Sequence, residues 1–149
     1  MDKRYFEDFE PGNERFVAKY RVTREEILEF GQKWDHLPFH NDEKIAQASA
    51  YGGLVASGTH TMAIRTAILT SQKVLTAVIA SFGWDDVRFP SPVRPDDELS
   101  LRVCCIEKRE SRSKPDRGII TNRVTMTNQK GETCLSMIDT LLVAKRLKK

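Results

Sequence analysis

The segment from Trp34 to His40 brings one carboxylate and two imidazoles together around a proline. Asp35 and His40 lie on either side of Pro38, which fixes the chain between them, so both side chains can reach one small volume. A carboxylate and an imidazole held together can divide a proton transfer, because one takes a proton from water while the other supplies one to carbon. This pair therefore favours hydration or dehydration chemistry.

The same segment allows two other interpretations. An aspartate and a histidine in a loop also occur as turn formers or exposed groups, and the local sequence leaves that alternative open. A metal site built from Asp35, His36 and His40 is disfavoured, because Pro38 removes the helical spacing that would turn both imidazoles to one side. We expect His36 to be exposed and the site to hold no metal.

A second kind of chemistry is indicated at Ser57 and Gly58, which precede an apolar stretch over residues 59–70 that is typical of a buried helix. The first N–H groups of a helix have no intrahelical acceptor, and the helix dipole is positive there. Gly58 would let a thioester carbonyl approach the main chain as it gains negative charge. Simple N-capping of the helix by Ser57 is the alternative, and the two roles are compatible.

The surrounding sequence predicts the elements that position these residues. Thr23-Arg-Glu-Glu26 is a capping box, which predicts a helix over residues 24–34 that ends before Pro38. Asp42 is a suitable cap for a second, short helix. Loose alternation over residues 15–22 predicts a first strand.

The second half of the chain has the residue composition of β-strands, separated by turn and basic segments. Four long strands in meander order are predicted, over residues 78–89, 98–107, 119–127 and 133–144. Helices early and antiparallel strands late indicate an α+β fold, with one sheet packed on one principal helix. The length of 149 residues fits a single domain over residues 1–149.

Composition narrows the class of protein. The 24 basic and 21 acidic residues give a net charge of +3, too balanced for a protein that binds nucleic acid through a dense basic face. Cys104, Cys105 and Cys134 are an odd number without a C-x-x-C pair, which favours a reducing compartment, and we expect the cytoplasm. We expect neither a secretory leader nor a membrane span, because no apolar run approaches the required length.

Residues 35–43, Asp-His-Leu-Pro-Phe-His-Asn-Asp-Glu, and the glycine segment 51–58 together resemble the hydratase motif of the MaoC-like dehydratases, the (R)-specific enoyl-CoA hydratase family. Segments 5–12, 87–95 and 127–132 also resemble the family, so the likeness covers nearly the whole chain. It implies a hot-dog fold, in which an antiparallel sheet wraps a central helix over about residues 58–72, and a homodimer that shares a continuous sheet.

The resemblance further implies reversible hydration of trans-2-enoyl-CoA to (R)-3-hydroxyacyl-CoA. Asp35 and His40 match the family's acid–base pair, and Gly58, preceded by Ser57, matches its oxyanion position. No cofactor is implied, since coenzyme A enters only as part of the substrate. A hot-dog acyl-CoA thioesterase and a non-catalytic acyl-thioester-binding protein remain open as alternatives.

Two departures from the family pattern stand out. Leu37 occupies a position at which many relatives carry an amide side chain, so it cannot orient the acid through its side chain. Asp96 follows Pro95 where the family has glycine, so a positive φ, if retained, would fall on an aspartate. Weaker candidates for acyl or coenzyme A contacts are Thr66 and the basic residues Arg88, Arg94 and 108–117.

Overall fold

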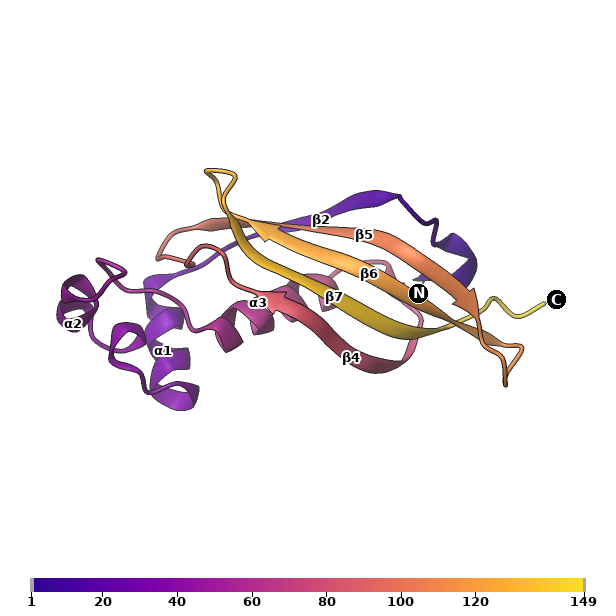
Figure 1. The fold of residues 1–149 in the computed structure, drawn as a ribbon, viewed down its shortest axis with the longest axis horizontal. Coiled ribbons are helices and arrows are strands. Elements are labelled where there is room, and N and C mark those ends of the chain that lie inside the picture. The colour runs from indigo at the N-terminus through magenta and orange to yellow at the C-terminus, as the bar shows by residue number, and fades with distance from the viewer. Residues whose placement is uncertain (1, 149) are drawn as a thin grey trace.

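A curved antiparallel sheet lies against one long helix in the computed structural model, which describes residues 2–148 (Figure 1). The helix, α3, runs from Gly58 to Thr70. The five strands lie in the order β2-β5-β6-β7-β4. Their bounds are β2 Glu14–Arg21, β4 Val78–Arg88, β5 Glu98–Glu110, β6 Arg117–Thr127 and β7 Thr133–Ala144. This is the predicted α+β hot-dog fold.

Short elements gather at one end of α3, at the left of Figure 1. They are α1 Arg24–Trp34, the 3-10 turn η2 Pro38–His40 and α2 Glu43–Ala48. At the start of the chain, η1 Phe6–Asp8 lies close to a two-stranded parallel pair, β1 Lys3–Arg4 and β3 Leu75–Thr76. The predicted capping box is confirmed, because the Glu26 N–H donates to the Thr23 hydroxyl over 3.2 Å and the Glu26 carboxylate bonds back to the Thr23 N–H.

The main core lies between α3 and the sheet. Ile64 and Ile68 of α3 pack in one cluster with inward-facing strand residues such as Leu99, Leu101 and Met126, all nearly inaccessible to solvent. Burial of each such side chain contributes about 1.5–3 kcal/mol. This packing fixes the helix against the sheet and so places the start of α3 relative to the loop that follows α1.

The predicted meander order is wrong for β4, which pairs with β7 at one edge of the sheet and not with β5. The segment between β4 and β5 contains Pro90, Pro92 and Pro95, which cannot donate backbone hydrogen bonds and so disfavour a tight hairpin. The chain instead crosses from the edge formed by β4 toward the opposite edge, where β5 lies between β2 and β6. The remaining strands, β5 to β7, form the predicted meander, and the other element boundaries differ from the prediction by three residues or fewer.

Asp96 has the positive φ expected of it, at 67°. The neighbouring Asp97 is buried, and its carboxylate accepts from the Arg94 N–H at 2.8 Å and from the Gln129 side chain at 2.9 Å. The turn before β5 is thus held by a buried carboxylate, with Asp96 in place of the expected glycine.

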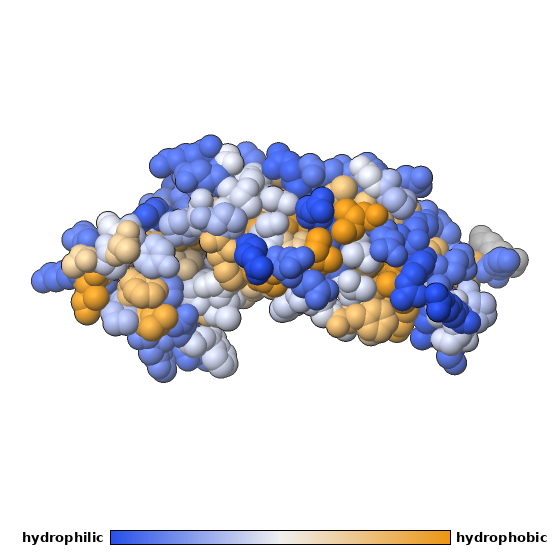
Figure 2. All heavy atoms as spheres, in the orientation of Figure 1, coloured by the Kyte–Doolittle hydropathy of each residue, from blue (hydrophilic) through white to orange (hydrophobic). Residues whose placement is uncertain are grey.

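The edge strand β4 exposes most of its apolar side chains. Val78, Ile79, Phe82 and Trp84 are each between 44% and 59% accessible. Figure 2 shows apolar residues, in orange, on this side of the molecule, including its lower border, where Figure 1 places β4. Among residues 2–148 no helix is long and apolar enough to cross a bilayer.

Candidate active site

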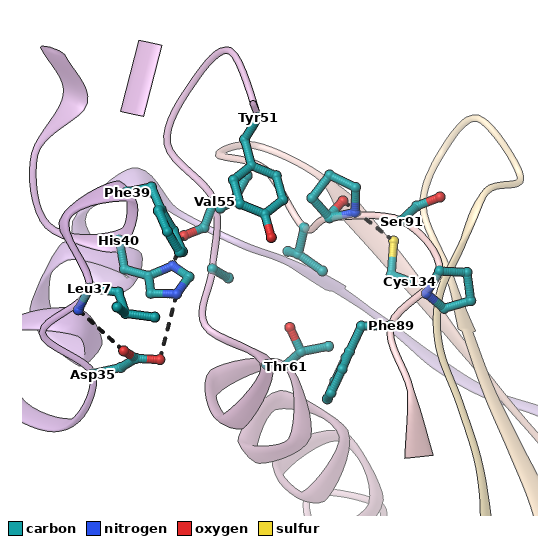
Figure 3. A pocket seen from close by; sticks show the side chains of 15 residues that line it. Asp35, Leu37, Phe39, His40, Tyr51, Val55, Thr61, Phe89, Ser91 and Cys134 are labelled. Carbon is teal, nitrogen blue, oxygen red and sulfur yellow. Dashed lines mark hydrogen bonds and ion pairs between the residues drawn. The ribbon is translucent and has the colours of Figure 1, made fainter. Parts of the chain in front are cut away.

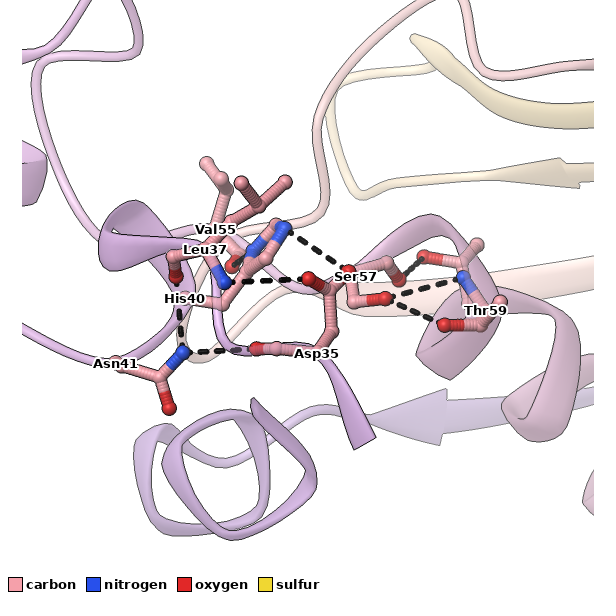
Figure 4. A network of polar contacts seen from close by, with 8 residues as sticks. Asp35, Leu37, His40, Asn41, Val55, Ser57 and Thr59 are labelled. Carbon is pink, nitrogen blue, oxygen red and sulfur yellow. Dashed lines mark hydrogen bonds and ion pairs between the residues drawn. The ribbon is translucent and has the colours of Figure 1, made fainter. Parts of the chain in front are cut away.

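Asp35 and His40 are held by the loop that ends α1. Asp35 is the C-cap of α1, with its N–H donating to the Gly31 carbonyl at 3.1 Å. Pro38 opens η2, and His40 closes it. The Asn41 side chain donates to the carbonyls of Asp35 at 2.8 Å and Leu37 at 2.9 Å, which ties the two ends of the loop together (Figure 4).

His40 faces Asp35, as the sequence predicts. Its ring is buried, at 6% exposure, and Nδ1 lies 2.6 Å from the Val55 carbonyl, which can only accept, so Nδ1 carries a proton. Nε2 lies 3.5 Å from Asp35 Oδ2. The ring nitrogen that can accept a proton therefore points at the carboxylate, whose side chain is 26% exposed.

The Leu37 side chain cannot orient Asp35, but the backbone N–H of Leu37 does so in part. The Leu37 N–H donates to Asp35 Oδ1 at 3.3 Å, while the leucine side chain is half-exposed and lines the cavity beside Asp35. One carboxylate oxygen of Asp35 is thus oriented by the main chain, and the other is left for His40 or a reactant. The leucine side chain at position 37 cannot take part in orienting Asp35.

Ser57 acts as the N-cap of α3, which confirms the capping alternative. Its buried hydroxyl accepts from the Thr59 N–H at 3.2 Å and lies 2.6 Å from Thr59 Oγ1 (Figure 4). Gly58 is the first helical residue, so its N–H has no intrahelical acceptor. A Cβ added at Gly58 would lie 3.0 Å from the Phe89 ring, so glycine allows the aromatic ring to approach the helix end.

One cavity of about 380 Å³ joins the two predicted sites, because Asp35, His40 and Gly58 all line it (Figure 3). In Figure 3 the Tyr51 hydroxyl points into the space between His40 and Phe89, and Thr61 of α3 lies below. An adjoining groove of about 650 Å³ continues along α3, and Asp35, Gly58 and Phe89 border both spaces. Tyr51, Thr61 and Phe89 were not predicted from the sequence, although Tyr51 lies in the glycine segment 51–58.

A buried histidine behind the site was also missed. His60, in the first turn of α3, is 5% exposed, stacks on Phe30 at 4.6 Å between ring centroids, and places Nε2 3.2 Å from Glu26 Oε1. Burial lowers the pKa of His60, while Glu26 opposes this effect. Glu26 also accepts from the Tyr20 hydroxyl, so the cap of α1 and the start of α3 share one network.

The remaining candidates have local partners. His36 is exposed as expected, with Nε2 3.0 Å from the Gln32 carbonyl, and no three His, Cys, Asp or Glu side chains of residues 2–148 are grouped to hold a metal. Thr66 donates to the Met62 carbonyl at 3.2 Å. Arg94 donates to the Tyr51 carbonyl at 2.6 Å, so it braces the glycine segment.

Cys105 and Cys134 are poor nucleophiles. Burial raises the pKa of the Cys105 thiol and raises the pKa of Cys134 to about 11. A thiol with a raised pKa has little thiolate at neutral pH. Cys134 lines the cavity, yet its sulfur lies near the Pro92 and Glu132 carbonyls and contributes shape more than reactivity.

Residues 9–128 match a protein-family profile described as "MaoC like domain". The chain is 29% identical over 107 residues to the protein MaoC of Klebsiella aerogenes, which covers 71% of this chain and 32% of that protein. The chain thus spans about a third of the length of this curated relative.

Solved structures show the same fold. A MaoC-like dehydratase from Rhodospirillum rubrum superposes with a TM-score of 0.90 at 34% identity and covers 97% of this chain and 99% of that one. The (R)-hydratase PhaJ1 from Pseudomonas aeruginosa superposes with a TM-score of 0.74 at 17% identity, over 97% and 92% of the two chains. At this lower identity the second likeness is one of fold.

Proposed function

This chain belongs to the MaoC-like dehydratase family, and from that premise we propose that it catalyses the reversible hydration of trans-2-enoyl-CoA to (R)-3-hydroxyacyl-CoA. The observation that carries the proposal is the convergence of Asp35, His40 and Gly58 on one cavity. The pair and the helix end come from segments separated by α2, so only the folded chain brings them together.

In the proposed reaction one water adds across the double bond. The water oxygen bonds to the β-carbon, and the π electrons move onto the thioester oxygen, which the Gly58 N–H stabilises. His40 Nε2, with Asp35 beside it, accepts the proton that the water loses. The pair returns a proton to the α-carbon as the enolate collapses, so the protein ends as it began.

The tautomer of His40 fits its proposed role as the proton acceptor. Because the Val55 carbonyl holds the proton on Nδ1, Nε2 is the basic nitrogen on the side of Asp35. Asp35 then stabilises the imidazolium that forms when Nε2 takes up a proton. Proton transfer and charge stabilisation both come from the chain, so we propose that no metal or redox cofactor takes part.

We further propose that two copies pair through β4. One side of this strand bonds to β7, and Trp84, one of its exposed apolar residues, borders the open groove along α3. An unpaired strand edge with exposed apolar side chains favours pairing with another strand. A second copy placed there would cover the groove that leads to Gly58.

Three unpaired cysteines fit the reducing cytoplasm as the compartment.

The test is turnover of crotonyl-CoA, followed by loss of enoyl absorbance together with chiral analysis of the product. We expect (R)-3-hydroxybutyryl-CoA from the wild type, and loss of turnover in Asp35→Asn. His36→Gln is the matched control, because it changes a neighbouring exposed imidazole outside the cavity and should retain activity.

The same assay separates the alternatives. Release of free thiol without loss of the double bond would indicate a thioesterase. Tight binding of crotonyl-CoA without any product would indicate an acyl-thioester-binding protein. Either result, or full activity of Asp35→Asn, would contradict the proposed hydration.

A further inference from the structure

A second cavity, of about 280 Å³, lies between α3 and the sheet beyond the candidate active site. Most of its wall is apolar, with Leu69 from α3, Val103 and Val124 from the sheet, and Leu75 from β3. An ordinary acyl pocket would be apolar throughout. Here, polar side chains also line the cavity, and four of them, Arg15, Arg65, Asn122 and Asp139, extend from α3 and the sheet.

Three of these side chains form a buried cluster. Arg65 of α3 donates from Nη2 to Asp139 Oδ2 at 2.6 Å, and both side chains are at most 6% exposed. Asn122 is directly opposite Asp139 in the pairing of β6 with β7, so both project to the same face of the sheet. The ion pair and the amide therefore lie side by side beneath α3.

The cluster is incompletely satisfied. Arg65 Nε, Asp139 Oδ1 and Asn122 Oδ1 are buried and have no hydrogen-bond partner among residues 2–148. A buried polar atom without a partner costs about 1–3 kcal/mol, so three such atoms on one cavity wall indicate that the cavity receives a polar group.

The charge of the cavity favours an anion. Arg15, on β2, is partly buried, and no carboxylate of the described chain forms an ion pair with it. Burial and the neighbouring Arg4 lower the pKa of Arg15 to about 10, which leaves it a cation at neutral pH. Arg15 and Arg65 against one aspartate give a net positive charge, and burial also raises the pKa of Asp139, which weakens the opposing charge.

The cavity is aligned with the candidate active site. The groove that starts at Gly58 and the second cavity share Thr66 as a lining residue. The rise of about 1.5 Å per residue places Thr66 about 12 Å along α3 from Gly58. An extended chain of eight carbons is about 9 Å long between its end carbons, so its terminal group ends close to Thr66.

We propose that the substrate is an acyl thioester whose chain ends in a carboxylate, and that Arg15 and Arg65 bind this carboxylate in the second cavity. The inference rests on the proposed function for the position of the thioester. Arg65 Nε and the Arg15 guanidinium would donate to the carboxylate. A methyl terminus would leave Arg65 Nε without an acceptor.

The test compares binding of two saturated thioesters, the mono-CoA thioester of octanedioic acid and octanoyl-CoA, by titration calorimetry. Neither has a double bond to hydrate, so the result does not depend on turnover. We expect the wild type to bind the carboxylate-ended thioester about 10- to 100-fold more tightly. For the four-carbon pair, butanedioic mono-thioester and butyryl-CoA, we expect no preference, because the shorter chain ends before the cavity.

Arg15→Gln should lose most of the preference at eight carbons. Its matched control is Arg123→Gln, which removes the same charge from an exposed position on β6 outside the cavity. Asn122→Leu is a second variant, in which tighter binding of octanoyl-CoA is expected because the cavity wall becomes more apolar.

Equal or tighter binding of octanoyl-CoA by the wild type would overturn the inference. So would an equal carboxylate preference at four carbons, or a preference that Arg15→Gln and Arg123→Gln reduce alike, since either result would locate the cation elsewhere. Crotonyl-CoA turnover reports separately on the proposed function. If turnover is observed without the eight-carbon preference, only the inference on substrate class fails.

Discussion

Asp35 and His40 are oriented by main-chain groups. The Leu37 N–H orients one oxygen of Asp35, and the Val55 carbonyl fixes the proton of His40 on Nδ1. Main-chain groups of a well-packed loop cannot rotate away, so the pair is preorganised before any substrate arrives. The two residues differ in what they contribute to the fold, because His40 is buried and hydrogen-bonded whereas Asp35 is partly exposed.

Substitution of the two residues should therefore separate activity from stability. Asp35→Asn keeps the shape and the bond from Leu37, so we expect an activity loss of about 10²- to 10⁴-fold with a nearly unchanged melting temperature. His40→Ala should lose activity and also about 2–4 kcal/mol of stability, because it leaves a cavity and an unpaired Val55 carbonyl. Denaturant unfolding beside the crotonyl-CoA assay checks both, and equal stability losses in the two variants would contradict this account.

His60 should make stability depend on pH. Its pKa is lowered by burial, so the unfolded chain binds the proton more readily than the folded one. Stability from this group is therefore fully present above the ordinary histidine pKa of 6.5 and falls as the pH drops below that value. His60→Gln should flatten the change in melting temperature between about pH 7.5 and 5. An unchanged slope in this variant, with His36→Gln as the exposed control, would show that another group is responsible.

The residues found from the sequence and those missed differ in a physical respect. Asp35 and His40 come from one short loop, so their spacing alone brings them together. Arg65 and Asp139 lie 74 positions apart, and His60 and Glu26 lie 34 apart. Such pairs depend on how α3 packs on the sheet and on α1, and no local pattern encodes that packing.

Among the elements, both boundaries of α1 could be predicted, because a capping box and a proline are local signals that mark its two ends. The position of β4 was not predictable in the same way. Its pairing with β7 depends on the path of the chain past the end of α3, which is a property of the whole sheet. The positive φ of Asp96 was predictable because a single turn position determines it.

Gly31 allows α1 to support the active-site loop. A Cβ at this position would lie 2.7 Å from the His40 carbonyl oxygen and 3.0 Å from Asn41 Oδ1. In an ordinary helix, glycine to alanine is favourable by about 1 kcal/mol. At Gly31 the nearest atom is a backbone oxygen, that of His40, so the loop that carries His40 would have to move to make room for a methyl group.

We therefore expect Gly31→Ala to destabilise the protein by about 1–3 kcal/mol and to reduce crotonyl-CoA turnover, because η2 carries His40. Gln32→Ala, at an exposed position on the same helix, is the matched control and should change neither quantity appreciably. A Gly31→Ala protein with wild-type activity would show that the loop tolerates displacement.

At the scale of the whole molecule, the open side of the structure is the side of β4. The strand has three register irregularities along its pairing with β7, and such bulges alone would discourage pairing with another strand. Its exposed apolar side chains favour such pairing, since Ile79 and Phe82 are 44% and 59% accessible. Burial of these two side chains against a second copy would contribute a few kcal/mol, on the order of 1.5–3 kcal/mol each.

The double variant Ile79→Lys/Phe82→Lys tests this pairing directly. We expect sedimentation equilibrium to give twice the 17.0 kDa chain mass for the wild type and the single chain mass for the variant, because the apolar contact is replaced by like charges facing each other across the interface. Ile106→Lys, also at an exposed apolar position but on the inner strand β5, should leave the dimer intact. If the β4 variant remains dimeric while folded, the copies associate through another face, and the groove along α3 is left open to solvent in the assembly.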